Sequence, residues 1–192
     1  MVLTVRANAI VKADRNNLRL YYRLILSYGD FKHAYRAAQY LLSEHDNFAK
    51  AGGDDLLLRA LYCSLVVSYA RPFNSTGSSR IGRIPPLTNE IDPLFSGDEV
   101  EVHEYILYCR NKLVAHSDAQ AIDPDPFVAT DLPNGMVIPE TNDALAPFTR
   151  EYTARVLGIA EKAYRWCVEK RYRLEPEVRH LLERRTFVRR SA

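Results

Sequence analysis

The segment that most constrains the fold is Leu56–Ala70, because its side chains are apolar almost all the way round a helix. Asp54 or Asp55 can cap the start of this helix, and Pro72 ends it by disfavouring a helical conformation at Arg71. A helix without a polar face has to be surrounded by other helices. We therefore predict an all-α bundle with this helix in the middle. Arg71 would then lie at a helix C-terminus, where backbone carbonyls favour a cation.

Apolar residues at three- and four-residue spacing predict more helices before this one. One helix is expected from Arg15 to Ser27 and a second from about Phe31 to His45. Gly29-Asp30 should break and recap the chain between them. Residues 1–14 fit either a short strand or the start of a helix.

The C-terminal part of the chain predicts a long last helix. Its cap is expected between Thr141 and Asp143, with Pro147 near the first turn. The inner face of this helix should consist of Phe148, Tyr152, Val156, Ile159, Ala163 and Cys167. Glu175-Pro176-Glu177 should interrupt it, before a final short helix over about 177–188.

Two stretches break the helical pattern. Residues 72–97 contain several prolines and glycines without periodicity, and a connection of this length is often functional or mobile. The short apolar runs on either side of Pro133-Asn134-Gly135 predict a small β-hairpin over about 127–138. The expected fold class is therefore an all-α helical bundle with one long loop and one small hairpin.

Composition fits a single domain over residues 1–192, with a basic helical extension from about residue 172. The hydrophobic fraction of 47% and the charged fraction of 26% exclude wholesale disorder. No apolar run approaches the roughly 20 residues of a membrane span, and we find no secretion signal. Cys63, Cys109 and Cys167 lie far apart in apolar surroundings, as expected for small buried residues in a reducing cytosol. We expect a cytoplasmic protein without membrane contact.

The residues that suggest chemistry are concentrated between Arg110 and Asp118. They follow an amphipathic helix that Ser96 to Glu99 should cap, and they include Asn111, Lys112 and His116. A guanidinium stays protonated and can hold two phosphate oxygens at once. An imidazole, whose pKa is normally about 6.5, can accept or donate a proton near neutral pH. Together these groups could cleave a phosphodiester without a metal ion.

This Arg-(five residues)-His pattern resembles the motif of HEPN domains, which are all-α proteins. The resemblance extends to Asn111 after the arginine and to Ala-His-Ser-Asp at the end, a form similar to HEPN proteins associated with abortive infection. The segment from Ser68 to Phe73 is also similar to that group, and residues 30–120 carry most of the likeness. A variant of the family carries a tyrosine two residues after the histidine that a partner nucleotidyltransferase modifies. That position is Asp118 here, so the same control is not expected.

The resemblance implies a metal-independent endoribonuclease of toxin–antitoxin or phage-defence systems. It assigns Arg110 to the phosphate and His116 to the proton, with 2′,3′-cyclic phosphate and 5′-hydroxyl products. Asn111, Lys112 and Arg71 are the candidate substrate-binding residues. No metal and no cofactor are expected, because neither a zinc signature nor a glycine-rich phosphate loop is present. The implied partners are RNA, a second copy of the chain and an antitoxin or inhibitor protein.

The geometry of the motif leaves two possibilities open. Six residues of a regular helix put Arg110 and His116 roughly 120° apart, so the two side chains do not share a face. Either the helix frays at Ala115, or the two residues act across a dimer in which paired motifs line one cleft, as is common in HEPN enzymes. Arg173 and His180 have a similar spacing, but the Glu-Pro-Glu interruption should separate them.

Other interpretations remain alongside the nuclease. The same cleft could belong to a non-catalytic HEPN scaffold that binds nucleotide, RNA or a partner protein, and a third possibility is a helical regulatory subunit. Nine basic and four acidic residues over 165–190 could guide RNA, or could form a solvated helix face with i,i+4 ion pairs. Arg80 and Arg83 could close over a substrate or simply keep the loop soluble. The tyrosines are expected to pack in the core, and His33, His45 and His103 are expected to be incidental.

Overall fold

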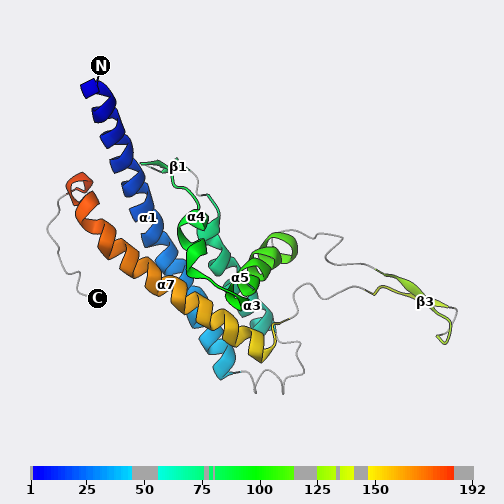
Figure 1. Ribbon diagram of the computed structural model, residues 1–192. Coiled ribbons are helices and arrows are strands. Elements are labelled where there is room, and N and C mark those ends of the chain that lie inside the picture. Colours follow the sequence, from blue (N-terminus) through cyan, green and yellow to red (C-terminus); the bar gives the residue numbers. More distant parts are fainter. Residues whose placement is uncertain are drawn as a thin grey trace.

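The computed structural model describes residues 2–44, 56–75, 78–79, 81–114, 125–132, 135–140 and 147–183, and of residues 2–12, 78–79, 89 and 113 the backbone only. Two long helices, α1 (Val2–Ser43) and α7 (Arg150–Val178), run antiparallel and make the most extensive contact of the fold (Figure 1). At a rise of about 1.5 Å per residue, α1 is roughly 60 Å long. Asn17 of α1 donates a hydrogen bond of 2.8 Å to Glu177 of α7, which ties the two helices together near one end.

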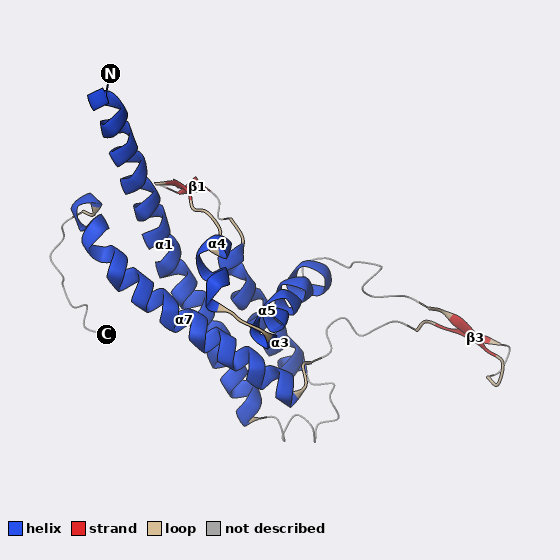
Figure 2. Ribbon diagram, in the orientation of Figure 1, coloured by secondary structure: helices blue, strands red, loops and turns tan. Residues whose placement is uncertain are grey.

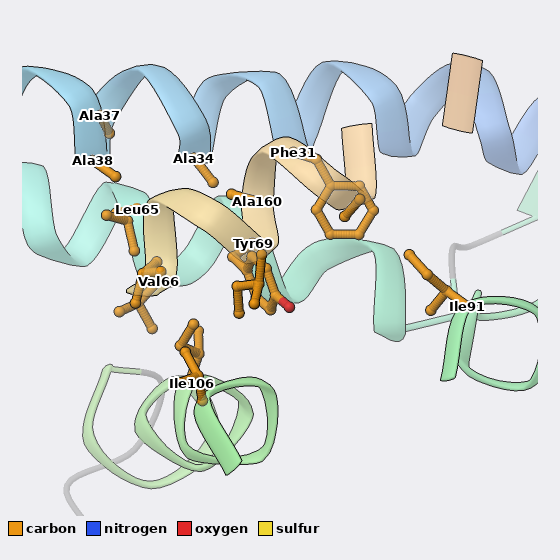
Figure 3. Packing of buried hydrophobic residues seen from close by; sticks show 14 of the residues in the cluster. Phe31, Ala34, Ala37, Ala38, Leu65, Val66, Tyr69, Ile91, Ile106 and Ala160 are labelled. Atoms are coloured by element: carbon orange, nitrogen blue, oxygen red, sulfur yellow. The ribbon is translucent and has the colours of Figure 1, made fainter. Parts of the chain in front are cut away.

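Helix α3 (Leu56–Ala70) lies against α1, and its C-terminal half fills the centre of the bundle (Figure 3). Leu65 and Tyr69 are fully buried there. The expected central helix is therefore present, and it ends at Ala70 as predicted. Its first turn differs from the expectation, because Leu56 is 82% exposed and the helix is not surrounded along its whole length.

The expected break at Gly29-Asp30 is wrong, because α1 continues through both residues. A glycine inside a helix costs about 1 kcal/mol relative to alanine. Leu24 before this point and Phe31 after it are both fully buried, and such burial contributes roughly 1.5–3 kcal/mol for each side chain. Packing on both sides therefore outweighs the weak local preference. The same helix extends back to Val2, which settles the ambiguity at the N-terminus.

The stretch 72–97, expected to be a long loop, is a connection built from short elements. These are η1 (Arg71–Phe73), β1 (Ser78–Ser79), β2 (Gly82–Arg83), α4 (Thr88–Ile91) and η2 (Asp92–Leu94). Leu87 and Ile91 are fully buried and anchor it in the core, and the buried Arg23 of α1 binds three of its backbone carbonyls. These long-range contacts order a segment whose sequence shows no periodicity.

Helix α5 (Asp98–Tyr108) begins as predicted. The Glu99 carboxylate accepts a hydrogen bond of 3.1 Å from the backbone N–H of Ser96, which is one half of the expected capping box. Val102, Ile106 and Cys109 form a buried stripe toward the core, and Figure 3 shows Ile106 next to Val66 of α3. The helix then continues directly into η3 (Cys109–Val114), which is a π-helix.

The predicted hairpin is confirmed. Strands β3 (Phe127–Ala129) and β4 (Met136–Ile138) pair antiparallel, with Val128 opposite Val137. Figure 2 shows that the hairpin extends away from the helices. Most of its apolar side chains are exposed, so it shares little of the bundle's core.

Helix α7 begins at Arg150, later than expected. Its cap is Thr149, whose hydroxyl accepts a hydrogen bond of 3.1 Å from the backbone N–H of Tyr152, and Pro147 lies before the helix. Thr141 to Asp143, where we expected the cap, lie outside the described residues. Of the expected inner face, Val156, Ile159, Ala163 and Cys167 are buried and Tyr152 is partly buried, whereas Phe148 precedes the helix.

The expected interruption at Pro176 is also wrong, because α7 runs through it to Val178 and then tightens into η4 (Arg179–Leu181). Leu174 and Val178 on either side are buried, whereas Pro176 is exposed. The carbonyl that loses its partner at a helix proline can therefore be hydrated, since Tyr172 one turn earlier is also exposed. Of the expected final helix over 177–188, residues from 184 onward lie outside the described residues.

The cysteines match their expected packing role. Cys109 and Cys167 are buried, Cys63 is partly buried, and all three carry free thiols. Burial raises the pKa of Cys167 to about 12, so this thiol stays protonated. None of the helices in the described ranges is long and apolar enough to cross a membrane.

Candidate functional site

The predicted Arg–His motif begins in the π-helix η3, which packs against α3. In a π-helix each backbone N–H bonds to the carbonyl five residues earlier, one more than in an α-helix, so the turn is wider. Short π-turns within α-helices are rare, and they occur frequently at functional sites. The separation of roughly 120° between Arg110 and His116 assumed a regular helix and does not apply across this turn.

Arg110 is half-buried, and its side chain is oriented by its neighbour. The guanidinium Nη1 donates a hydrogen bond of 2.8 Å to Oδ1 of Asn111. Asn111 and Lys112 are both exposed. Within the described ranges, no carboxylate forms an ion pair with Arg110. The structure thus presents an oriented cation at the surface, with an amide and a second basic residue beside it.

His116 lies outside the described residues, as do Ala115 and Asp118. The juxtaposition of Arg110 and His116 therefore stays a prediction, and so does their meeting across a dimer. Arg80 and His45 also lie outside the described residues. Arg83 is described and exposed, and its Nη2 donates a hydrogen bond of 2.6 Å to Ser75 within the same connection.

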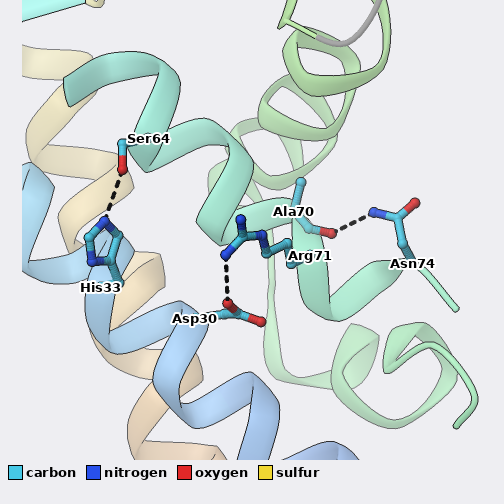
Figure 4. A network of polar contacts seen from close by, with 6 residues as sticks. All are labelled: Asp30, His33, Ser64, Ala70, Arg71 and Asn74. Atoms are coloured by element: carbon cyan, nitrogen blue, oxygen red, sulfur yellow. Dashed lines mark hydrogen bonds and ion pairs between the residues drawn. The ribbon is translucent and has the colours of Figure 1, made fainter. Parts of the chain in front are cut away.

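Arg71 belongs to a different polar cluster, on the side of α3 that faces α1 (Figure 4). Its guanidinium lies 3.6 Å from the carboxylate of Asp30, and its side chain is 63% exposed. Partial burial raises the pKa of Asp30, and the nearby charge of Arg71 reduces that effect. The contacts of Arg71 are thus with α1, whereas Arg110 contacts its own neighbour. The structure records no contact that brings these two predicted site residues together.

The same cluster contains a histidine and a serine that the sequence did not connect. Nε2 of His33 lies 2.9 Å from Oγ of Ser64, and both line a cavity of about 640 Å³ together with Asp30, Cys63 and Arg71. His33 is therefore not incidental. Because these residues come from two helices, no spacing within the sequence could have revealed their contact.

His103 has a packing role that the sequence also missed. It is buried, with Nδ1 lying 3.1 Å from the hydroxyl of Tyr69 and its ring stacked on Phe95 at 5.1 Å. Burial lowers the pKa of His103, while Asp92 and Glu104 act in the opposite direction. A neutral imidazole in an aromatic core is a structural element of the fold.

A second cavity, of about 470 Å³, opens between α5 and the start of α7. Three aromatic side chains line it, and Tyr105 contacts both Phe148 at 6.1 Å and Tyr152 at 5.4 Å between ring centroids. The guanidinium of Arg155 lies over the Tyr152 ring at 5.7 Å, and Glu101 also lines the cavity. Burial is the main cause that raises the pKa of Tyr152 to about 12, so its hydroxyl is neutral at physiological pH.

The basic residues of α7 and η4 are largely paired. Arg165, Arg173 and Arg179 each form an ion pair with the glutamate four residues earlier, and Lys170 pairs with Glu90 of α4. This pattern favours a solvated helix face over a free RNA-guiding arm for the described part of the segment. His180 is likewise near an acid, with Nε2 lying 3.6 Å from Asp14. The second Arg–His pair of the sequence therefore has acidic partners at both ends.

Across the described residues, no group of three or more His, Cys, Asp or Glu side chains is arranged to hold a metal ion. The resemblance to HEPN domains rests on the sequence of residues 30–120 alone. Comparison of the chain with models of protein families, with curated proteins and with solved structures found no match in any of the three.

Proposed function

We propose that this chain is a metal-independent endoribonuclease of the HEPN type that acts as a homodimer in toxin–antitoxin or phage-defence biology. The observation that carries this proposal is the setting of Arg110. Its guanidinium is held by the Asn111 amide in a π-helix, and no carboxylate of the described residues neutralises it. Such a group can hold two oxygens of a phosphate and remains charged throughout a reaction.

In the proposed reaction, the 2′-oxygen of RNA attacks the adjacent phosphorus and the bond to the 5′-oxygen breaks. His116 serves as the base that accepts the 2′-hydroxyl proton or, when protonated, as the acid that protonates the leaving 5′-oxygen. Arg110 stabilises the negative charge that builds up on the phosphorane. Asn111 orients the guanidinium, and Lys112 contacts the RNA backbone. The products are a 2′,3′-cyclic phosphate and a 5′-hydroxyl.

The hairpin β3–β4 supports the homodimer. Val128 and Val137 oppose each other on one face and are 56% and 61% exposed, while Phe127 and Met136 are exposed on the other face. A two-stranded hairpin is at best marginally stable in water on its own. Exposed apolar surface of this kind is typical of protein–protein contacts. We propose that a second copy of the chain covers it.

Cleavage of single-stranded RNA by the purified protein in EDTA tests the proposal. We expect activity to survive chelation and to fall at least a hundredfold in Arg110→Ala and in His116→Ala, the usual scale for loss of a general acid–base or charge-stabilising group. Arg173→Ala and His180→Ala form the matched control, since that pair has similar spacing and should be dispensable. Activity that is lost with EDTA, or that persists in both Arg110→Ala and His116→Ala, contradicts the proposal.

A mixture of the two inactive variants tests the composite site. If Arg110 of one copy works with His116 of the other, refolding Arg110→Ala together with His116→Ala produces heterodimers that carry one intact site, and activity returns. A mixture that stays as inactive as its components shows that each copy uses its own pair.

The aromatic cavity between α5 and α7 favours a second candidate, an RNA-binding protein without catalytic activity. Aromatic side chains and nearby cations bind single strands without any chemistry. RNA binding by the wild-type protein, with no cleavage under any condition, would select this candidate over the nuclease.

A further inference from the structure

We infer that the exposed aromatic face of α5, formed by Tyr105 and Tyr108, and the adjoining cavity between α5 and α7 bind the bases of a single-stranded RNA. We call these residues, together with Phe148, Tyr152 and Arg155, the base site. The inference rests on the proposed function, because it supplies the base contacts that accompany the phosphate contact of Arg110.

The two tyrosines of α5 are not explained by core packing. Tyr105 and Tyr108 are 45% and 44% exposed, whereas Tyr69 in the true core is fully buried. Their ring centroids lie 6.2 Å apart, with planes only 18° from parallel. Two adjacent and nearly parallel rings at the surface offer the flat π-faces on which successive bases stack.

The cavity continues this face inward. Tyr105 forms part of its wall, with Phe148 and Tyr152 behind it at 5.0 Å from each other. A volume of about 470 Å³ lies within the range of small-molecule sites, so a nucleobase with its ribose can enter. The apolar walls favour a flat ring such as a nucleobase over an extended apolar chain.

Charged groups at the cavity suit the edges and backbone of a nucleotide. The Nη2 of Arg155 is fixed by a hydrogen bond of 3.1 Å to the carbonyl of Asp98, while its guanidinium faces the Tyr152 ring. Glu101 provides an acceptor for the amino group of a base. The site thus holds one donor group and one acceptor group around an aromatic floor.

The base site and the phosphate site are close along the same helix. Tyr108 precedes Arg110 by two positions in the sequence, and Tyr105 precedes it by five. Exposed Lys112 follows within one turn. Because residues two positions apart do not share a helix face, a strand that contacts both the rings and Arg110 has to pass around the helix.

The test uses the full chain and a 2′-O-methyl oligoribonucleotide of mixed sequence, which cannot be cleaved, so that binding is measured without catalysis. Fluorescence anisotropy should show roughly tenfold weaker binding for Tyr105→Ala and again for Tyr108→Ala. Tyr172→Ala is the matched control, because Tyr172 is 61% exposed and has Arg171 over its ring at 5.1 Å, but lies outside the base site. Its binding should change less than twofold.

Salt dependence separates the base site from the phosphate site. The tyrosine variants should leave the slope of log K against log salt unchanged, whereas Arg110→Ala and Lys112→Ala should each reduce it by about one. Wild-type-like binding by the Tyr105→Ala,Tyr108→Ala double variant, or no binding of the oligonucleotide by the wild type, overturns the inference. If the base site is right but the proposed nuclease activity is wrong, RNA binding depends on these tyrosines and unmodified RNA is not cleaved.

If the tyrosine variants fold poorly, a second measurement on the wild-type protein tests the same inference. Ultraviolet cross-linking of the wild-type protein to an oligonucleotide containing 5-bromouridine should join the base to Tyr105, Tyr108, Phe148 or Tyr152. Cross-links that map only to other parts of the chain contradict the inference.

Discussion

Replacing Arg23 should remove the clamp that holds the 72–97 connection against α1. The Arg23 side chain is only 2% exposed, and burial lowers its pKa. Its Nε donates to the carbonyl of Pro85 at 2.6 Å, and its Nη2 donates to the carbonyls of Asn74 at 2.8 Å and Ile84 at 3.2 Å. The planar guanidinium thus satisfies three carbonyls of one segment.

In Arg23→Met the apolar stem remains but all three hydrogen bonds are lost. Hydrogen bonds to a charged group contribute about 1.5 kcal/mol or more each, so their loss removes roughly 4–5 kcal/mol. Removing the guanidinium also removes the desolvation cost of a buried charge, which offsets part of this loss. We expect a net loss of about 3 kcal/mol in the free energy of unfolding. That is a large fraction of the roughly 5–15 kcal/mol of a typical domain. Arg23→Lys should lose less, because an ammonium reaches fewer of the carbonyls.

Urea unfolding followed by circular dichroism measures this change. Arg19→Met is the matched control, since Arg19 lies one turn earlier on α1 and, among the described residues, makes one long hydrogen bond of 3.3 Å to the carbonyl of Ile81. We expect less than about 1 kcal/mol from the control. Equal losses in Arg23→Met and Arg19→Met would refute the reasoning, because the buried carbonyls would then not depend on the guanidinium.

Three further changes follow from the structure. The Ser27 hydroxyl is buried without a hydrogen-bond partner among the described groups, so Ser27→Ala should raise the free energy of unfolding by about 1 kcal/mol in the same urea assay; a loss of stability contradicts this. His103 has a lowered pKa in the folded state, so the unfolded chain takes up this proton at a higher pH than the folded chain does. Stability should therefore fall as the pH drops below about 6.5. If the urea midpoint of His103→Gln depends on pH as strongly as that of the wild type, this is ruled out. If the proposed homodimer forms, Val128→Asp with Val137→Asp should convert it to monomer in sedimentation experiments without changing helical content, whereas an unchanged mass would show that the hairpin is not the interface.

Local patterns predicted most helices of this fold. The end of α3 before Pro72, the Ser96–Glu99 cap and the hairpin around Gly135 all follow from short-range preferences; the first and third are confirmed, and one of the two bonds of the cap is present. The expected breaks at Gly29 and Pro176 fail for one physical reason. Each local penalty is smaller than the burial of the residues on both sides, and that burial depends on helices distant in the sequence.

The same distinction between local and long-range contacts applies to the candidate site. The contact between Arg110 and Asn111 joins sequence neighbours, although the motif assigned Asn111 to the substrate and did not predict this bond. The partner of Arg71, by contrast, is Asp30 on another helix, and the walls of the aromatic cavity come from both α5 and α7. Periodicity placed the tyrosines on helices, but it could not show that Tyr105 and Tyr108 face solvent. A sequence therefore predicts the assembly of a cavity poorly.

The most direct measurement is the chemical identity of the RNA ends produced in EDTA, determined by mass spectrometry on an oligonucleotide with one preferred cleavage position. Attack by the neighbouring 2′-hydroxyl predicts a 2′,3′-cyclic phosphate and a 5′-hydroxyl, and predicts no cleavage when that single nucleotide carries 2′-hydrogen instead. Products ending in 3′-hydroxyl and 5′-phosphate, or unchanged cleavage of the 2′-deoxy substrate, would contradict the role given to Arg110 and His116.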